Sequence, residues 1–214
     1  MKKNRNKGFT LSEALITLSI VGILAVIILP GLIKDSMNRA MVSSLKGVIT
    51  NLNDAINTEL VNKRALTLKD TDFYKDPNKF LRTLDAIKVV SDNSLFVSSY
   101  KTISGTSSNT ASMDASATLK NGATLGIIKN NTGNSQIYID TNGQKGPNIF
   151  GLDCFVVTIV TQNDTAKGDH AGDIGCTTAE SSSISSCKSD GTTCYCALER
   201  SGFDYKYLEL TDIY

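Results

Sequence analysis

Histidine, proline and tryptophan are scarce in this 214-residue chain, which has one His, three Pro and no Trp. The single histidine, His170, lies in a Lys-Gly-Asp-His-Ala-Gly-Asp stretch that is typical of an exposed loop, and we expect no metal role for it. The chain also lacks a Gly-rich phosphate loop and the H-E-x-x-H and G-x-S-x-G motifs. Its acidic residues are scattered singly, so we predict that the protein is not an enzyme.

A strong charge of either sign is also missing. The chain has 22 Lys and Arg against 21 Asp and Glu, for a formal net charge of +1. Nucleic-acid binding would require a basic patch, so we expect no nucleic-acid contact. After residue 90 the chain is rich in Ser, Thr, Asn and Gly, a composition that favours a β-rich, loop-rich exported domain.

Charge is completely absent from Ala14 to Ile33, a run of 20 mainly apolar residues. A run of that length can span the hydrocarbon core of a bilayer. Four cations precede it in the first eight residues, and such a flank stays on the cytoplasmic side. Glu13 stands at the start of the run, where a carboxylate is costly unless a partner neutralises it. We therefore expect this segment to dock against something positive.

Two simpler interpretations explain less of this N-terminus. A secretory signal peptide also begins with basic residues and an apolar stretch, but this stretch is too long and no A-x-A-like cleavage site follows it. An ordinary membrane anchor explains the length and the basic flank. It does not explain the sequence Gly-Phe-Thr-Leu-Ser-Glu at residues 8–13.

These residues resemble the N-terminus of the type IV filament family, which includes type IV pilins, competence pilins and the pseudopilins of type II secretion. The resemblance implies that a prepilin peptidase cuts after Gly8 and that Phe9 becomes the methylated N-terminus. It also implies that Glu13 pairs with the N-terminal amine of a neighbouring subunit. Pro30 matches a proline that many members carry inside the same helix. The resemblance covers roughly residues 1–55.

The same resemblance implies a location and a set of partners. The subunit is expected in the plasma (inner) membrane, with its C-terminus outside the cytoplasm, and then in an extracellular or periplasmic filament. Its expected partners are the prepilin peptidase, other pilin or pseudopilin subunits, the inner-membrane assembly platform and membrane lipid. The alternative function is a membrane-anchored surface binding module that never polymerises.

Apolar residues continue beyond the span at helical spacing. Met37, Met41, Leu45, Val48 and Leu52 recur every three or four residues, which predicts an amphipathic helix. One helix is therefore expected from about Phe9 to Asn62, with a kink or local melting at Pro30. The expected organisation is a leader at residues 1–8, a spanning helix at 9–33, an amphipathic helix at 34–62 and a globular head at 63–214.

The head is predicted to be α+β, with an antiparallel sheet packed against the second half of the long helix as in pilins. A second helix is expected at 77–90, after Asp76 as N-cap. Asn121-Gly122 predicts a type I′ hairpin turn between two strands. The expected strands are residues 117–120, 123–128, 136–140 and 154–160. Polar loops are expected at 104–116 and 161–193, and a short helix or strand at 195–207.

All five cysteines follow the apolar run, where an exported chain meets an oxidising compartment. They are Cys154, Cys176, Cys187, Cys194 and Cys196. We expect two disulfides and one free thiol, because zinc would require other cysteine spacings or more histidine. Cys194 and Cys196 are expected to pair with different partners, since neighbouring strand positions face opposite sides. The sequence does not select the pairing.

One internal segment has the pattern of an oxygen-rich calcium loop. Its candidate ligands are Asp140, Asn142, Gln144, Asn148 and Asp153. Alternating Asp and Asn residues with Gly can wrap Ca²⁺, but no Glu closes the loop as in an EF-hand. Some pseudopilins bind Ca²⁺ in a loop of the head. The alternative is a tight turn between two strands, in which Asp and Asn cap the turn. No cofactor is expected to be required.

Overall fold

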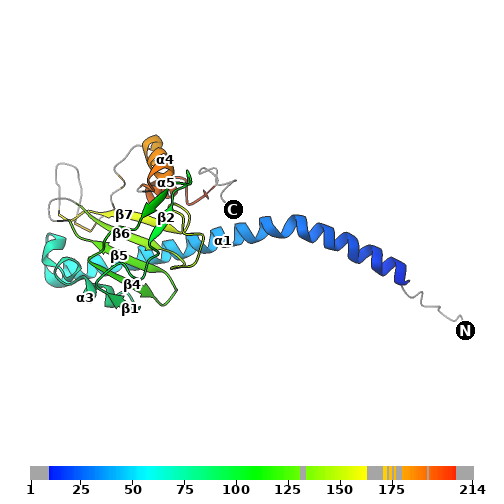
Figure 1. Ribbon diagram of the computed structural model, residues 1–214. Coiled ribbons are helices and arrows are strands. Elements are labelled where there is room, and N and C mark those ends of the chain that lie inside the picture. Colours follow the sequence, from blue (N-terminus) through cyan, green and yellow to red (C-terminus); the bar gives the residue numbers. More distant parts are fainter. Residues whose placement is uncertain are drawn as a thin grey trace, which may run out of the picture. The chain divides into compact units, whose positions relative to one another are not determined.

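The computed structural model describes residues 10–130, 134–162, 171–172, 174, 176, 180–191 and 193–205. It divides into two compact units, Met1–Ala40 and Met41–Tyr214. Helix α1, Leu11–Lys63, runs through both units (Figure 1). In the first unit the described part is helical from Leu11 onward, and all strands among the described residues belong to the second unit.

Helix α1 is continuous through Pro30, so the prediction of local melting is wrong. A proline removes one backbone donor, and the remaining helical hydrogen bonds on both sides hold the chain. Within the second unit, α1 buries one face made of aliphatic and Met side chains. The buried residues are Met41, Leu45, Val48, Ile49, Leu52 and Ile56. This list confirms the predicted amphipathic spacing from Met41 to Ile56, whereas Met37, which was expected on the same face, is exposed.

Five antiparallel strands form the main sheet in the order β1-β4-β5-β6-β7. Their bounds are β1 Ala86–Val90, β4 Ala115–Leu119, β5 Thr124–Ile128, β6 Ser135–Asp140 and β7 Cys154–Ile159. The last four strands follow one another as a meander, and β1 adds beside β4. The α+β prediction, with a long helix and an antiparallel sheet, is confirmed (Figure 1).

The hairpin between β4 and β5 forms where Asn121-Gly122 predicted it, but with a different turn. The Gly122 amide donates to the Leu119 carbonyl at 3.0 Å, and the Leu119 amide donates to the Ala123 carbonyl at 2.8 Å. Only Gly122 has a positive φ, of 89°, within this loop. The loop therefore has three residues, Lys120 to Gly122, with the glycine in the left-handed region. A type I′ turn would need a positive φ at both central residues.

The helix predicted at 77–90 is shorter than expected. Helix α3 covers Pro77–Arg82, and the Asp76 carboxylate caps it by accepting from the Lys79 amide at 3.1 Å. Asp85 has a φ of 58°, which ends the helical path, and β1 follows at once. Three of the five residues of β1 are β-branched, and pairing with β4 overrides the helical spacing.

The predicted loop at 104–116 is also partly strand. Strands β2, Ser99–Lys101, and β3, Ser107–Asn109, form a separate two-stranded antiparallel ribbon. β4 then begins at Ala115. The polar composition of this region carries no hydrophobic alternation, so periodicity could not reveal these short strands.

Both faces of the sheet are covered. One face belongs to the main core, which joins the buried side of α1 to Leu125, Ile137 and Phe155. The opposite face carries a second cluster in which Tyr100 of β2 packs with Val156 of β7. Strand β7 alternates between the two clusters, as a strand between two covered faces must.

The C-terminal region contains two helices. The first lies within the polar loop expected at 161–193, and the second lies where a short helix or strand was expected. Helix α4 covers Glu180–Ser189 and α5 covers Cys194–Arg200. Short turns of helix, η1 Leu68–Asp70 and α2 Asp72–Lys75, lie between α1 and α3. Helix α4 is rich in serine and has a weak apolar face, so its sequence resembles a loop.

Two disulfides link this region, Cys176–Cys196 and Cys187–Cys194, and Cys154 is a buried free thiol. The expected two bridges and one free thiol are therefore present. Cys194 and Cys196 do pair with different partners, but they lie on a helix and not on a strand. Two residues along a helix also point in nearly opposite directions, because each residue turns about 100°.

Candidate assembly and processing site

The described structure begins at Thr10, so the predicted processing residues Gly8 and Phe9 lie outside the described residues. Thr10 immediately precedes α1 and occupies the N-cap position. The Ala14 amide donates to the Thr10 carbonyl at 3.2 Å, which is the first helical hydrogen bond. The site can therefore be followed from the second residue after the predicted cleavage point.

Glu13 and Thr10 form a reciprocal capping box at the start of α1. The Thr10 amide donates to Glu13 Oε2 at 2.9 Å, and the Thr10 hydroxyl donates to the same oxygen at 2.8 Å. The Glu13 amide donates to Thr10 Oγ1 at 3.2 Å. Such a box satisfies backbone donors that a helix N-terminus otherwise leaves open.

The helix that follows exposes large apolar side chains on every side. Leu11 is 80% exposed and Val26 is 75% exposed, and the pattern continues to Ile33. By length and composition, α1 is able to cross a membrane. A helix that is hydrophobic all round requires lipid or other helices around it. Pro30 lies within this exposed stretch, where its missing amide leaves one carbonyl without its helical donor.

Comparison with protein families gives one match in this region. Residues 3–29 match the family model of the prokaryotic N-terminal methylation motif. The chain carries a prepilin-type signal. This is the signature of type IV pilins and pseudopilins, and it includes the predicted cleavage point and Glu13. Neither the comparison with curated proteins nor that with solved structures gave a match.

A prepilin-type signal marks subunits that a prepilin peptidase processes and that assemble with other pilin subunits. It belongs to structural filament proteins and not to enzymes. The resemblance found on Gly8, Phe9 and Glu13 is thus confirmed at the level of the N-terminal signal.

The calcium candidates lie around the connection between β6 and β7. Asp140 accepts from the Tyr100 hydroxyl at 2.5 Å and from the Asn142 amide at 3.1 Å. Asp153 accepts from the Asn148 and Ile149 amides, both at 2.7 Å. Both carboxyl groups are fully buried, and burial raises their pKa values, for Asp140 to about 7. Both carboxylates therefore accept hydrogen bonds from backbone amides of the connection itself, and Asp140 also accepts one from Tyr100 of β2.

The three amide candidates are arranged differently. Gln144 donates to the carbonyls of Ser94 and Phe96, so its side chain joins another loop. Asn142 donates to the Gly146 carbonyl at 3.2 Å, while the side-chain oxygens of Asn142 and Asn148 are buried without a partner. Among the described residues, no group of three or more His, Cys, Asp or Glu could hold a metal ion. The contacts favour the structural turn, and calcium binding stays the alternative prediction.

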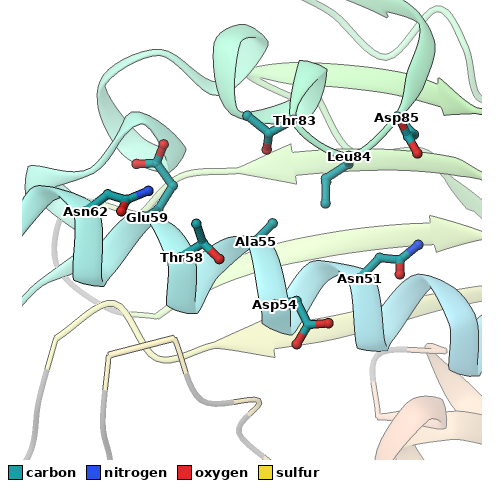
Figure 2. Close-up of a pocket in the computed structure, with 9 residues that line it drawn as sticks. All are labelled: Asn51, Asp54, Ala55, Thr58, Glu59, Asn62, Thr83, Leu84 and Asp85. Carbon is teal, nitrogen blue, oxygen red and sulfur yellow. The ribbon is translucent and has the colours of Figure 1, made fainter.

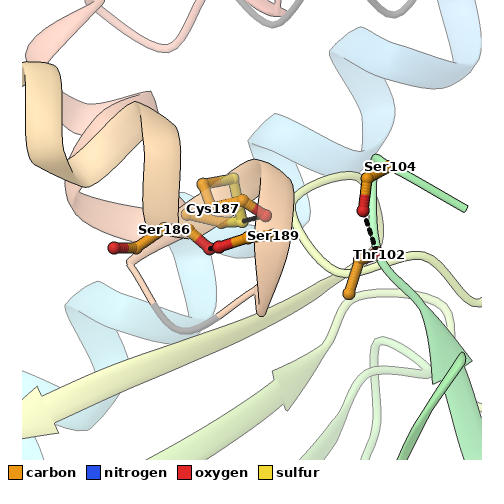
Figure 3. The surroundings of a disulfide bond; sticks show 6 residues. Thr102, Ser104, Ser186, Cys187 and Ser189 are labelled. Atoms are coloured by element: carbon orange, nitrogen blue, oxygen red, sulfur yellow. Dashed lines mark hydrogen bonds between the residues drawn. A yellow bond between two sulfur atoms is a disulfide. The ribbon is translucent and has the colours of Figure 1, made fainter. Parts of the chain in front are cut away.

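The Cys187–Cys194 disulfide lies against Gly151, before β7, and the helix that carries Cys187 contacts the segment after β2. The Ser104 amide, after β2, donates to the carbonyl of Lys188 at 3.1 Å. Figure 3 shows Cys187 in its disulfide together with the hydrogen bond that joins the hydroxyls of Thr102 and Ser104. Gly151, with a φ of 86°, leaves room for the bridge, because a Cβ there would lie 2.7 Å from Cys194 Sγ. The disulfide joins α4 to α5, while the Lys188 carbonyl contacts the β2–β3 turn and the bridge itself packs against Gly151 before β7.

A polar groove of about 390 Å³ lies between the second half of α1 and the residues that join α3 to β1 (Figure 2). Its carboxylates come from Asp54, Glu59 and Asp85. Glu59 accepts from the Asp72 amide, and Asp85 pairs with Lys120 at 3.1 Å. The sequence could not reveal this groove, because it depends on how α3 and β1 pack beside the helix.

Proposed function

We propose that this protein is a structural subunit of a type IV pilus or of a type II secretion pseudopilus. A prepilin peptidase removes residues 1–8, and Phe9 becomes the methylated N-terminus. The mature chain then assembles through its N-terminal helix. Its function is packing in a filament, without catalysis.

The observation that carries this proposal is the methylation motif at residues 3–29, whose part from Leu11 onward lies in the exposed apolar stretch of α1. Residues 11–33 have no described partner that covers their apolar side chains. In the membrane, lipid covers them. In the filament, the same side chains pack against the helices of neighbouring subunits, so one surface serves both states.

Glu13 gives the assembly its register. It is the carboxylate at the N-terminal edge of the apolar run, and an uncompensated charge there costs a few kcal/mol. Cleavage after Gly8 creates the Phe9 amine of each subunit. Pairing of that amine with Glu13 of a neighbour offsets the cost in a low-dielectric environment, and a misplaced neighbour would leave both charges unpaired.

The alternative is a membrane-anchored surface binding module that does not polymerise. Its support is the Ser- and Thr-rich, disulfide-linked C-terminal region, which suits a specialised exposed surface. An anchor of this kind has no need of cleavage after Gly8. Processing and polymerisation therefore separate the two functions.

The experiment compares sheared surface fractions with membrane fractions from cells that make the wild-type chain or Glu13→Ala. The proposal expects wild-type protein in filaments and Glu13→Ala in the membrane, cleaved and folded. Glu13→Gln should lose less, because its amide still accepts hydrogen bonds. Wild-type protein that stays in the membrane under conditions in which the filament system assembles would support the anchored module.

A further inference from the structure

We propose that Asn121 is a modification site, at which the folded protein loses the side-chain amide by deamidation and gains a carboxylate. The site is the turn of the β4–β5 hairpin. The reaction needs no enzyme, and it does not depend on processing or on filament assembly. Its co-reactant is water, and its products are an acidic residue and ammonia.

The chemistry follows from the dipeptide Asn121-Gly122. The Gly122 nitrogen loses its proton and attacks Cγ of Asn121, a C–N bond forms, and the side-chain nitrogen takes a proton from water and leaves as ammonia. Water then opens the five-membered imide at either carbonyl, which gives aspartate or isoaspartate. Glycine favours the attack because it has no Cβ to hinder a close approach of its backbone.

The hairpin exposes the reacting groups to solvent. Asn121 and Gly122 are both exposed, and a Cβ added to Gly122 would meet no heavy atom within 4 Å. The side-chain oxygen of Asn121 accepts a hydrogen bond from the Ala123 amide at 3.1 Å, which folds the side chain along the peptide that contains the attacking nitrogen. The same hydrogen bond draws electron density from Cγ, so this carbon becomes more electrophilic.

One contact opposes the reaction. The Gly122 amide donates to the Leu119 carbonyl at 3.0 Å, so the nitrogen must leave this hydrogen bond before it attacks. The bond lies in an exposed turn, and exposed turns open locally with a much smaller free energy than the core strands beside them. This hydrogen bond therefore slows the reaction without preventing it.

A second Asn-Gly pair, Asn142-Gly143, has the same two residues in a packed environment. The side-chain oxygen of Asn142 is buried, and its side-chain nitrogen donates to the Gly146 carbonyl at 3.2 Å. Gly143 is buried, and a Cβ added to it would lie 3.2 Å from the Gly122 carbonyl. Ring closure at this pair requires the connection between β6 and β7 to open, so we expect the fold to protect Asn142.

The product changes the charge of the hairpin. Lys120 precedes the site and pairs with Asp85 at 3.1 Å, so a new carboxylate at position 121 competes with Asp85 for the same ammonium group. Isoaspartate also adds one carbon to the main chain of the three-residue loop. The isoaspartate form should therefore unfold more easily than the Asn121→Asp variant.

The test incubates the full chain in detergent at mildly alkaline pH, in water labelled with heavy oxygen, and follows both Asn-Gly pairs by peptide mapping and mass spectrometry. The label marks only the modification that occurs during the incubation. We expect Asn121 to react at least about tenfold faster than Asn142, which corresponds to about 1.4 kcal/mol in activation free energy. In denaturant, with the disulfides intact, the two pairs should react at similar rates.

The hairpin product should be a mixture of isoaspartate and aspartate, since direct hydrolysis of the amide without the imide gives aspartate alone. A folded protein that keeps Asn121 unmodified while the denatured chain reacts would overturn the proposal. Equal rates at Asn121 and Asn142 in the folded protein would also overturn it. A ratio of rates that is the same in folded and denatured protein would overturn the role of the turn and assign the preference to the residues that follow each pair.

Discussion

Asp140 should make the stability of the head depend on pH in a direction opposite to that of most carboxylates. It is fully buried at the end of β6, and burial raises its pKa to about 7 from an ordinary 3.8. The Tyr100 hydroxyl and the Asn142 amide donate to it and oppose this rise without cancelling it. The folded protein therefore holds the Asp140 proton more tightly than the unfolded chain does.

The sign follows from proton linkage. Between pH 4 and pH 7 the folded state binds more protons at Asp140 than the unfolded state, so the free energy of unfolding falls as pH rises. One pKa unit is worth 1.36 kcal/mol, so a rise of about three units gives a loss of at most about 4 kcal/mol across this window. Above pH 7 this contribution should be constant.

The assay is denaturant unfolding of the full chain in detergent, from pH 4 to pH 8. Asp140→Asn should flatten the dependence relative to wild type, because the amide does not titrate. Asp85→Asn is the matched control, since it makes the same substitution at a side chain that is 79% exposed beside Lys120. An Asp140→Asn protein that keeps the wild-type slope would refute the reasoning.

Three other predictions concern the head. Chelation with EDTA should leave the melting temperature unchanged, since backbone and side-chain donors already occupy the Asp140 and Asp153 oxygens; a clear fall would support calcium. Non-reducing peptide mapping should find the disulfides Cys176–Cys196 and Cys187–Cys194. Cys154 should be alkylated only after unfolding, because its thiol is buried and burial raises its pKa. Gly151→Ala should destabilise the oxidised head by about 1–3 kcal/mol in denaturant unfolding, by crowding the Cys187–Cys194 bridge; unchanged stability would contradict this packing.

The long helix and the central strands could be predicted because their patterns are local. The spacing of Met41, Leu45 and Val48 is helical by itself, and β6 and β7 are runs rich in β-branched residues. Residues 86–90 show the limit of this reasoning. Ile87 and Lys88 continue a helical stripe, but pairing with β4 places them in a strand.

The covering of the second sheet face could not be predicted. The β2–β3 ribbon that covers it is polar. Tyr100 is buried only because β2 packs over β7, where its hydroxyl meets Asp140, 40 positions away in the sequence. Helix α4 has the composition of a loop and is linked through Cys187, whose partner the sequence did not select. Contacts between distant segments leave no periodic signal in the chain.

At the candidate site, the capping box between Thr10 and Glu13 could have been predicted from the sequence. Thr10 followed three residues later by Glu13, ahead of an apolar run, is the sequence pattern of a capping box. The cost of a carboxylate in a membrane predicts only a positively charged partner for Glu13, which was expected in another subunit. The partner of Glu13 in the structure is instead Thr10, which immediately precedes the same helix.

The central claim is that this chain is a processed filament subunit, and the most direct test is mass spectrometry of the protein recovered from sheared surface filaments. The account predicts a chain that begins at Phe9, with a methyl group on its N-terminal amine. Assembled protein that still begins at Met1 would contradict it.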